Sequence, residues 1–117
     1  MDFDTATVIK RHLDALMSRD LDRLMEDYAE DAFFLSNMAP VAVRGLAALR
    51  AFWAQAFLIF TPEVLTGLKF TQQEIEEDVA FILWSAGPAI PFGSDTFVVR
   101  DGKIIAQTGA VLIAPRG

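Results

Sequence analysis

The sequence predicts an α+β fold in which helices pack on one face of a curved, mainly antiparallel sheet. Segments with helical spacing of apolar residues come first, and segments of alternating or β-branched character fill the second half. Between the last two of these lies Asp101-Gly102, which suits a two-residue hairpin turn because both central positions need φ > 0. With 117 residues and no cysteine, residues 1–117 suit one domain without disulfides.

The helical segments lie in the first half of the chain. Apolar spacing predicts a helix from about Thr5 to Ser18 with His12 on its buried face, and a short second helix capped by Asp20. A strand is predicted over 32–38, and a third helix over 46–60 that Pro62 ends. Two further strands, over 64–76 and 79–86, and a loop over 87–91 precede the hairpin.

The predicted hairpin over 94–112 carries the most informative residue. The register that follows from the turn places Asp95 opposite Thr108, on a face that is otherwise apolar, while Gln107 and Thr96 point away. A carboxylic acid on the core side of a sheet indicates either a neutral donor with a raised pKa or a base. The alternative is an acid at the rim of the sheet that reaches solvent or the backbone.

Composition excludes several classes of partner. The net charge is −6, the pI is about 4.6, and no basic run is present, so neither nucleic acid nor an anionic membrane surface is expected as a partner. The longest uncharged stretch, over 79–94, is shorter than the ~20 apolar residues of a membrane helix. The N-terminal segment is acidic, so no signal peptide and a cytoplasmic location are expected. The hydrophobic fraction of 53% predicts a lined cavity or a subunit interface.

Three segments resemble the nuclear transport factor 2-like superfamily, and within it the SnoaL-like and ketosteroid-isomerase-like branch: DLDRLMEDYAEDA (20–32), VRGLAALRAFW (43–53) and SDTFVVRDGKI (94–104). The resemblance covers essentially the whole chain. It implies a cone-shaped α+β barrel in which three helices close the concave face of the sheet around a mostly apolar pocket. It also implies a homodimer, which in this superfamily often forms through the outer face of the sheet. This architecture hosts isomerases, cyclases, dehydratases, hydrolases and non-catalytic members, so it implies no single activity.

The resemblance also assigns positions. The carboxylate base of the ketosteroid isomerases corresponds to Ser36, with Asn37 beside it, and neither can serve as a carboxylate base. The tyrosine that donates to the oxyanion corresponds to His12, and the second donor, a protonated carboxylic acid, corresponds to Asp95. Steroid isomerisation by that mechanism is therefore not expected.

The predicted site joins His12 and Asp95 across one cavity, where the imidazole would be a general base oriented by the carboxylate. The alternative for His12 is a core histidine bonded to a backbone carbonyl or to Tyr28. As the only histidine, it excludes a two-histidine metal site, and no metal is expected. Ser36 and Asn37 would orient a ligand carbonyl. The aromatic residues expected to line the pocket, unless they form plain core, are Tyr28, Trp53, Phe57, Trp84 and Phe97.

These residues predict an acid–base enzyme of isomerase, cyclase or dehydratase type, acting on a small apolar carbonyl or hydroxyl compound. No cofactor is expected, because proton transfer needs none and the sequence has no phosphate loop or dinucleotide fingerprint. Two alternatives stay open. The loss of a carboxylate at Ser36 favours a non-catalytic binder of a small hydrophobic molecule. Val98, Ile105 and Val111, predicted on the outer face, favour a dimerisation module with a vestigial cavity.

Overall fold

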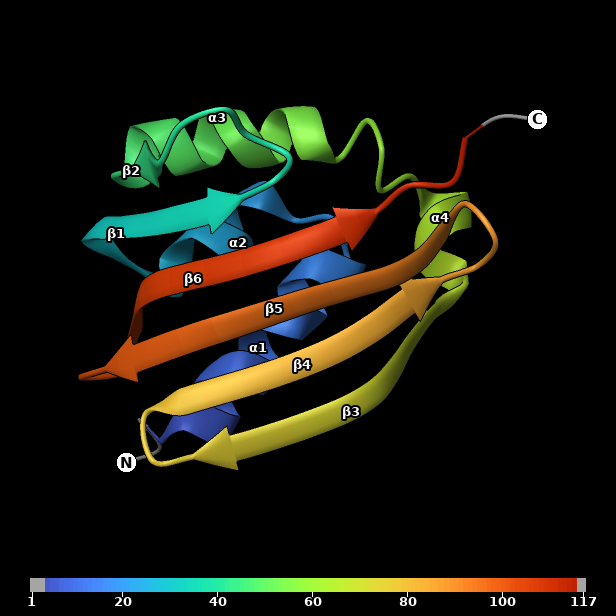
Figure 1. Cartoon of the computed structure of the whole chain (residues 1–117). Helices are drawn as coiled ribbons and strands as arrows, with labels where there is room; N and C mark the ends of the chain where they lie inside the picture. The colour runs from blue at the N-terminus through green and yellow to red at the C-terminus, as the bar shows by residue number, and fades with distance from the viewer. Residues whose placement is uncertain (1–3, 116–117) are drawn as a thin grey trace.

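The structure is a computed structural model that describes residues 4–115. Its sheet has the strand order β2-β1-β6-β5-β4-β3, and all neighbours are antiparallel except the parallel pair β1 and β6 (Figure 1). The elements in chain order are α1 (Thr5–Met17), α2 (Leu21–Glu26), β1 (Tyr28–Ser36), β2 (Val43–Arg44), α3 (Leu46–Ala56), α4 (Pro62–Thr66), β3 (Leu68–Glu76), β4 (Val79–Ala86), β5 (Ile90–Arg100) and β6 (Lys103–Leu112).

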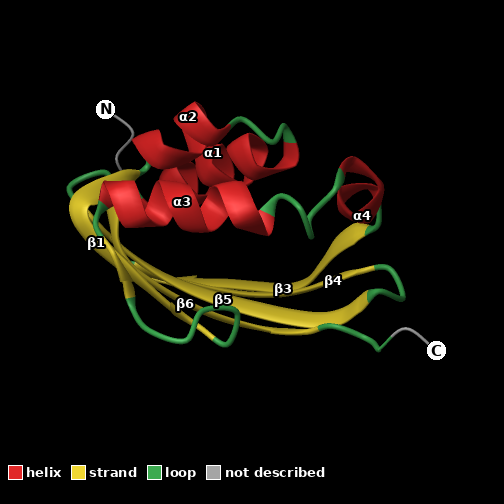
Figure 2. Cartoon of the chain, turned by 90° about the horizontal axis from the view of Figure 1, so that it is seen from above, coloured by secondary structure: helices red, strands yellow, loops and turns green. Residues whose placement is uncertain are grey.

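The helices lie on one side of a strongly curved sheet. In Figure 2, α1, α2 and α3 cover its concave face toward one end of the sheet, and α4 lies near the other end of the sheet. This arrangement confirms the predicted α+β class, with a sheet that curls without closing. Within residues 4–115, every helix is too short or too polar to cross a membrane. Residues 1–3, part of the segment in which no signal peptide was expected, lie outside the described residues.

Local sequence signals explain the first two helices. Asp4 caps α1, because its carboxylate accepts a hydrogen bond from Thr7 N at 2.8 Å, and Asp20 caps α2 by accepting from Arg23 N at 3.1 Å. His12 is buried on α1 as predicted, with 2% of its surface exposed. Both predicted helices are confirmed.

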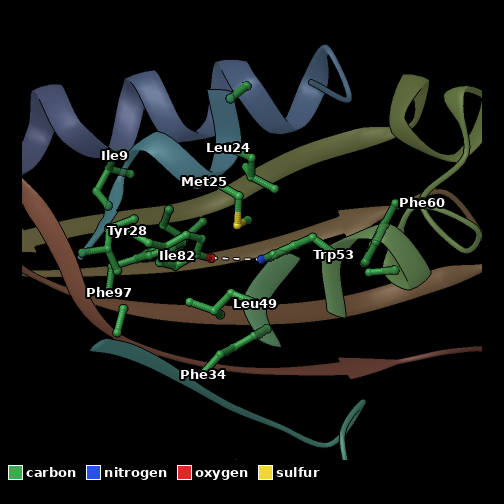
Figure 3. Packing of buried hydrophobic residues seen from close by; sticks show 14 of the residues in the cluster. Ile9, Leu24, Met25, Tyr28, Phe34, Leu49, Trp53, Phe60, Ile82 and Phe97 are labelled. Atoms are coloured by element: carbon green, nitrogen blue, oxygen red, sulfur yellow. Dashed lines mark hydrogen bonds between the residues drawn. The ribbon is translucent and has the colours of Figure 1, made fainter. Parts of the chain in front are cut away.

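The core fills the space between the helices and the inner face of the sheet. β4 shows the pattern most clearly, because its residues alternate between the core and the outer face. Figure 3 shows side chains from α1, α2, α3 and the strands meeting in this layer. The inward residues of β4 are Ala80, Ile82, Trp84 and Ala86.

The middle of the chain differs from the prediction in its boundaries. α3 ends at Ala56, and Pro62 begins α4 instead of only ending the preceding helix; proline suits a first helical turn because its missing N–H has no helical partner there. β3 therefore starts at Leu68 and not at residue 64. β1 starts at Tyr28, four residues earlier than predicted, and β5 at Ile90, within the predicted loop. The short strand β2 lies between the strand predicted over 32–38 and the helix predicted over 46–60, in a segment to which no strand was assigned.

The hairpin turn is confirmed, but the register beyond it is not. Arg100 pairs with Lys103 and Val99 with Ile104 as predicted, and a bulge then adds one residue to β6. Asp95 consequently pairs with Gly109 and not with Thr108. Since side chains alternate along a strand, the one-residue shift brings the inward face of β6 to Gln107, Gly109 and Val111. The predicted outward positions of Gln107 and Val111 are therefore wrong.

Candidate functional site

A cavity of about 50 Å³ lies between the sheet and the helices. Its walls are apolar apart from three polar residues, Ser36 from β1 and Ser94 and Asp95 from β5. Of the aromatic residues expected at the pocket, Trp53, Trp84 and Phe97 line it. Asp95 is the only titratable residue among the lining residues, and it is half-buried.

Two neighbouring side chains hold the Asp95 carboxylate. Trp84 Nε1 donates to Oδ2 at 2.9 Å, and Gln107 Nε2 donates to Oδ1 at 3.0 Å. Gly93 makes the first bond possible: a Cβ at this position would lie 2.2 Å from the Trp84 ring. The indole can therefore lie across the glycine and reach the carboxylate two residues further along β5.

The hydrogen bonds behind Asp95 form a chain with a fixed direction. Trp53 Nε1, which can only donate, donates to Tyr28 Oη at 3.1 Å, the dashed line in Figure 3. Tyr28 in turn donates to Gln107 Oε1 at 2.5 Å. Because Oε1 accepts from Tyr28, the amide of Gln107 must present Nε2 to Asp95. Both carboxylate oxygens therefore face N–H groups, an arrangement that favours the ionised form.

Burial and hydrogen bonding shift the pKa of Asp95 in opposite directions. Burial raises the pKa of Asp95 to about 6, against the lowering effect of the hydrogen bonds from Gln107 and Trp84. At neutral pH the group is therefore a carboxylate with proton affinity well above that of an ordinary aspartate. Such a group is suited to accept a proton, and this favours a base over a neutral donor. Burial also raises the pKa of Tyr28, so its hydroxyl keeps its proton.

The raised pKa of Asp95 predicts a specific dependence of stability on pH. Stabilisation by the protonated group is complete below the pKa of the unfolded chain, near 4, and is lost as pH rises through the folded pKa of about 6. Relative to Asp95→Asn, the wild type should therefore lose at most about 3 kcal/mol of unfolding free energy between pH 4 and pH 7. Urea denaturation of both proteins at the two pH values measures this difference. A constant difference would contradict the raised pKa.

The structure does not bring His12 to Asp95, so the predicted contact between them is wrong. His12 Nδ1 lies 3.3 Å from Asp27 Oδ2, and the imidazole packs edge-on against Tyr28 and Phe97, with ring centroids 5.0 and 5.7 Å away. His12 is not among the residues that line the cavity. The expectation failed because Asp27, the residue after α2, offers a nearer carboxylate.

Asp27 forms a buried cluster with His12 and Arg11. Its carboxylate is 2% exposed and accepts from Arg11 Nε at 2.8 Å. Burial by itself would raise the pKa of Asp27, but the hydrogen bonds and charges of His12 and Arg11 outweigh it and lower the pKa. The cluster ties α1 to the start of β1 and is separate from the cavity. Within residues 4–115, no group of three or more potential ligands is placed to hold a metal ion.

Three residues predicted to bind ligand do not line the cavity: Tyr28, Asn37 and Phe57. Tyr28 lies behind Gln107 in the hydrogen-bond chain. The Asn37 side chain instead pairs with the backbone of Val111, donating to its oxygen at 2.8 Å and accepting from its nitrogen at 3.0 Å. Phe57 packs under the Arg19 guanidinium at 5.3 Å.

Gln107 is the site residue that the sequence prediction missed. It is buried, with 2% of its surface exposed, and it connects Asp95 to Tyr28. The sequence contains a signal for this role, because the Gln107 amide lies in the middle of the mostly apolar segment 103–112, and a buried amide needs hydrogen-bond partners. The assumed register concealed it, because that register placed Gln107 on the outer face.

Comparisons with known proteins agree with the fold. A SnoaL-like protein of unknown function from Burkholderia thailandensis has a TM-score of 0.75 and 16% identity, over 92% of this chain and 94% of that chain. A candidate polyketide cyclase from Sinorhizobium meliloti has a TM-score of 0.70 and 20% identity, over 88% and 93%. A candidate ketosteroid isomerase from Kribbella flavida has a TM-score of 0.70 and 18% identity, over 97% and 81%.

The sequence itself matches a family model. No curated protein matches the chain significantly. The model for the SnoaL-like domain, in contrast, matches residues 9–107, most of the chain and every element from the middle of α1 to the centre of β6. The chain belongs to the SnoaL-like domain family.

Proposed function

We propose that the protein is an acid–base enzyme of isomerase, cyclase or dehydratase type, which uses the Asp95 carboxylate as its base. The substrate is a small apolar compound with a carbonyl or hydroxyl group. One observation carries the proposal: the single titratable side chain that lines an apolar cavity is a carboxylate whose two oxygens are both held by N–H donors. The similarity to a candidate polyketide cyclase and a candidate ketosteroid isomerase supports the same reaction class.

The surroundings of Asp95 suit proton abstraction from carbon. Apolar walls limit the access of water, so solvent disperses the charge of the half-buried carboxylate only in part. The hydrogen-bond chain from Trp53 through Tyr28 and Gln107 fixes the position of one carboxylate oxygen, and Trp84 fixes the other. A base held in this way needs little rearrangement to receive a proton. Proton transfer of this kind requires no cofactor.

The size of the cavity sets a condition on substrate binding. At about 50 Å³ it is smaller than the roughly 300–1,000 Å³ of pockets that hold drug-sized ligands. An open groove of about 300 Å³ lies beside it between α1 and β3, and Leu13 and Phe70 line both spaces. We propose that these two side chains move apart to admit the substrate, whose reactive end then reaches Asp95.

Hydrogen exchange tests the proposed chemistry without knowledge of the natural substrate. The protein should accelerate deuterium incorporation at the α-carbon of small apolar ketones, for which acetone, cyclohexanone and acetophenone form a graded series. Mass spectrometry or NMR measures the rate. Acceleration beyond that of the same concentration of acetate buffer supports the proposal. Rates equal to the buffer rate for all three ketones would contradict it.

Gln107→Leu should raise the pH midpoint of this exchange. The variant removes the N–H that donates to Asp95 Oδ1, and a hydrogen bond to a charged group is worth about 1.5–3 kcal/mol. The midpoint should therefore rise from about 6 by about one to two units. An unchanged midpoint in a folded variant would show that Gln107 does not influence the base.

A second candidate function is the binding of a small hydrophobic molecule without catalysis. The observation in its favour is that β1 brings Ser36, and no second titratable group, to the cavity wall. Native mass spectrometry of the protein purified from its source would then show a carried ligand, and the ketones would not exchange. A protein that carries no ligand and exchanges the ketones would instead favour the enzyme.

We also propose that the chain forms a homodimer through the outer face of its sheet, where Leu35, Val79 and Leu112 are 46%, 39% and 57% exposed. Covering such apolar side chains is favourable in water. Light scattering at micromolar concentration should give twice the chain mass, and a monomer would contradict the dimer. The cytoplasmic location and the absence of nucleic-acid and membrane partners stay predictions.

A further inference from the structure

We propose that the Ser36 hydroxyl binds the carbonyl oxygen of the substrate, and that Gly109 lets the Asp95 carboxylate lean toward Ser36, so that the reacting atoms contact both residues. This assigns the substrate class as a compound with an acidic C–H next to a carbonyl group. The inference rests on the proposed role of Asp95 as the base.

The sheet places the three residues in one row. Gly109 of β6 pairs with Ser36 of β1 on one side and with Asp95 of β5 on the other. Paired residues of adjacent strands lie side by side and point to the same face, so the Ser36 and Asp95 Cα atoms are two strand spacings apart, roughly 10 Å. Both side chains line the cavity.

Gly109 leaves room for the Asp95 carboxylate to lie over β6. A Cβ at this position would lie 2.4 Å from Asp95 Oδ1 and 2.9 Å from the Ser94 backbone oxygen. The carboxylate therefore leans over the glycine, toward Ser36. The distance from Asp95 Oδ1 to β1 is about one strand spacing, ~5 Å. That is enough for a carbonyl group and its neighbouring carbon to contact both residues.

The Ser36 hydroxyl can donate a hydrogen bond to a ligand in the cavity. Its oxygen accepts a hydrogen bond from Met38 N at 3.0 Å, a local contact that orients the side chain at the end of β1. In the part of the chain that the structure describes, the hydroxyl proton is donated to no other residue. A half-buried hydroxyl with an unused proton in an apolar cavity gains most from an acceptor on a ligand.

The two residues complete a balanced proton transfer. Asp95 removes a proton from the carbon next to the carbonyl, and the C–H electron pair forms the C=C bond of an enolate. The C=O π pair moves to oxygen, where the growing negative charge strengthens the hydrogen bond from Ser36. The carboxylic acid of Asp95 then returns the proton, either to the same carbon, which gives exchange, or to another carbon of the conjugated system, which gives an isomer.

Infrared spectroscopy of bound cyclohexanone, labelled with ¹³C at the carbonyl, tests the assignment directly. In the wild type and in Asp95→Asn the C=O band should move to lower wavenumber than in an apolar solvent. Ser36→Ala should abolish this shift, and Ser36→Thr, which keeps a hydroxyl, should restore it. Ser85→Ala, the same change on the outer side of β4, is the matched control and should behave as wild type.

Exchange kinetics provide the second readout. Ser36→Ala should slow deuterium exchange of cyclohexanone by about 10²-fold, the usual cost of losing one oxyanion donor. Gly109→Ala should remove the exchange, because its Cβ needs the position that Asp95 occupies. A wild-type band that does not shift, or a shift that survives in Ser36→Ala, would overturn the inference. Unchanged exchange in Ser36→Ala would overturn it too and leave Asp95 as the base. A serine-dependent shift without any exchange would instead refute the proposed function and keep the carbonyl site.

Discussion

Asp95→Asn is expected to slow α-hydrogen exchange of small ketones by about 10²–10⁴-fold, the contribution that a positioned general base typically makes. Asparagine has almost the same shape, but its amide cannot accept a proton at neutral pH. It keeps one oxygen, so one of the two N–H donors, Trp84 or Gln107, loses its acceptor. That loss is offset in part because no charge has to be buried. The variant should therefore fold.

Asp101→Asn is the matched control for this experiment. The residue is exposed in the hairpin turn with φ of 52°, a conformation that asparagine adopts readily. Its exchange rate should equal that of the wild type. If Asp95→Asn is folded by circular dichroism and retains the wild-type rate, Asp95 is not the base.

Asp27→Asn should cause the largest loss of stability among single changes of charge, about 2–4 kcal/mol at pH 7. Removing one partner of a buried ion pair typically costs about 3–5 kcal/mol, and here Arg11 is 45% exposed, so solvent compensates part of the loss. The lowered pKa of Asp27 means that its stabilisation is present above pH ~4 and disappears as pH falls through the folded pKa. The difference between variant and wild type should therefore shrink in acid.

Urea denaturation at pH 7 and pH 3 measures this effect. Asp14→Asn serves as the control, because Asp14 forms an exposed ion pair with Lys10 at 3.1 Å and should change stability by less than about 0.5 kcal/mol. At temperatures where Asp27→Asn is folded, it should exchange ketones at the wild-type rate. A folded Asp27→Asn protein without exchange activity would show that the cluster of Arg11, His12 and Asp27 takes part in the reaction.

The parts of the fold that local signals determine were predictable from sequence. Asp4 and Asp20 mark helix starts because their carboxylates satisfy free backbone N–H groups, and Asp101-Gly102 marks the hairpin turn because few residues accept positive φ. The alternation of β4 reveals which of its faces is buried. Short elements such as β2 and α4 carry too few residues for a periodic signal, and their position depends on contacts with the rest of the chain.

The site was only partly predictable, because it depends on a single inserted residue. Asp95 was identified correctly as a residue of the cavity wall, but its partner was not. The bulge in β6 turns Gln107 inward and places Gly109 beside Asp95, and nothing in the turn sequence specifies a bulge several residues away. His12 was placed correctly on the buried face of α1, and yet its carboxylate partner is Asp27, whose position depends on how α1 and α2 pack.

Titration of Asp95 by ¹³C NMR tests the central claim most directly. With carboxyl-labelled aspartate, the signal assigned by its absence from Asp95→Asn should titrate with a midpoint of about 6. Addition of cyclohexanone should perturb the Asp95 signal and leave that of Asp101 unchanged. A midpoint near 4 together with no response to the ketone would show that Asp95 is an ordinary surface carboxylate, and the proposed base would be wrong.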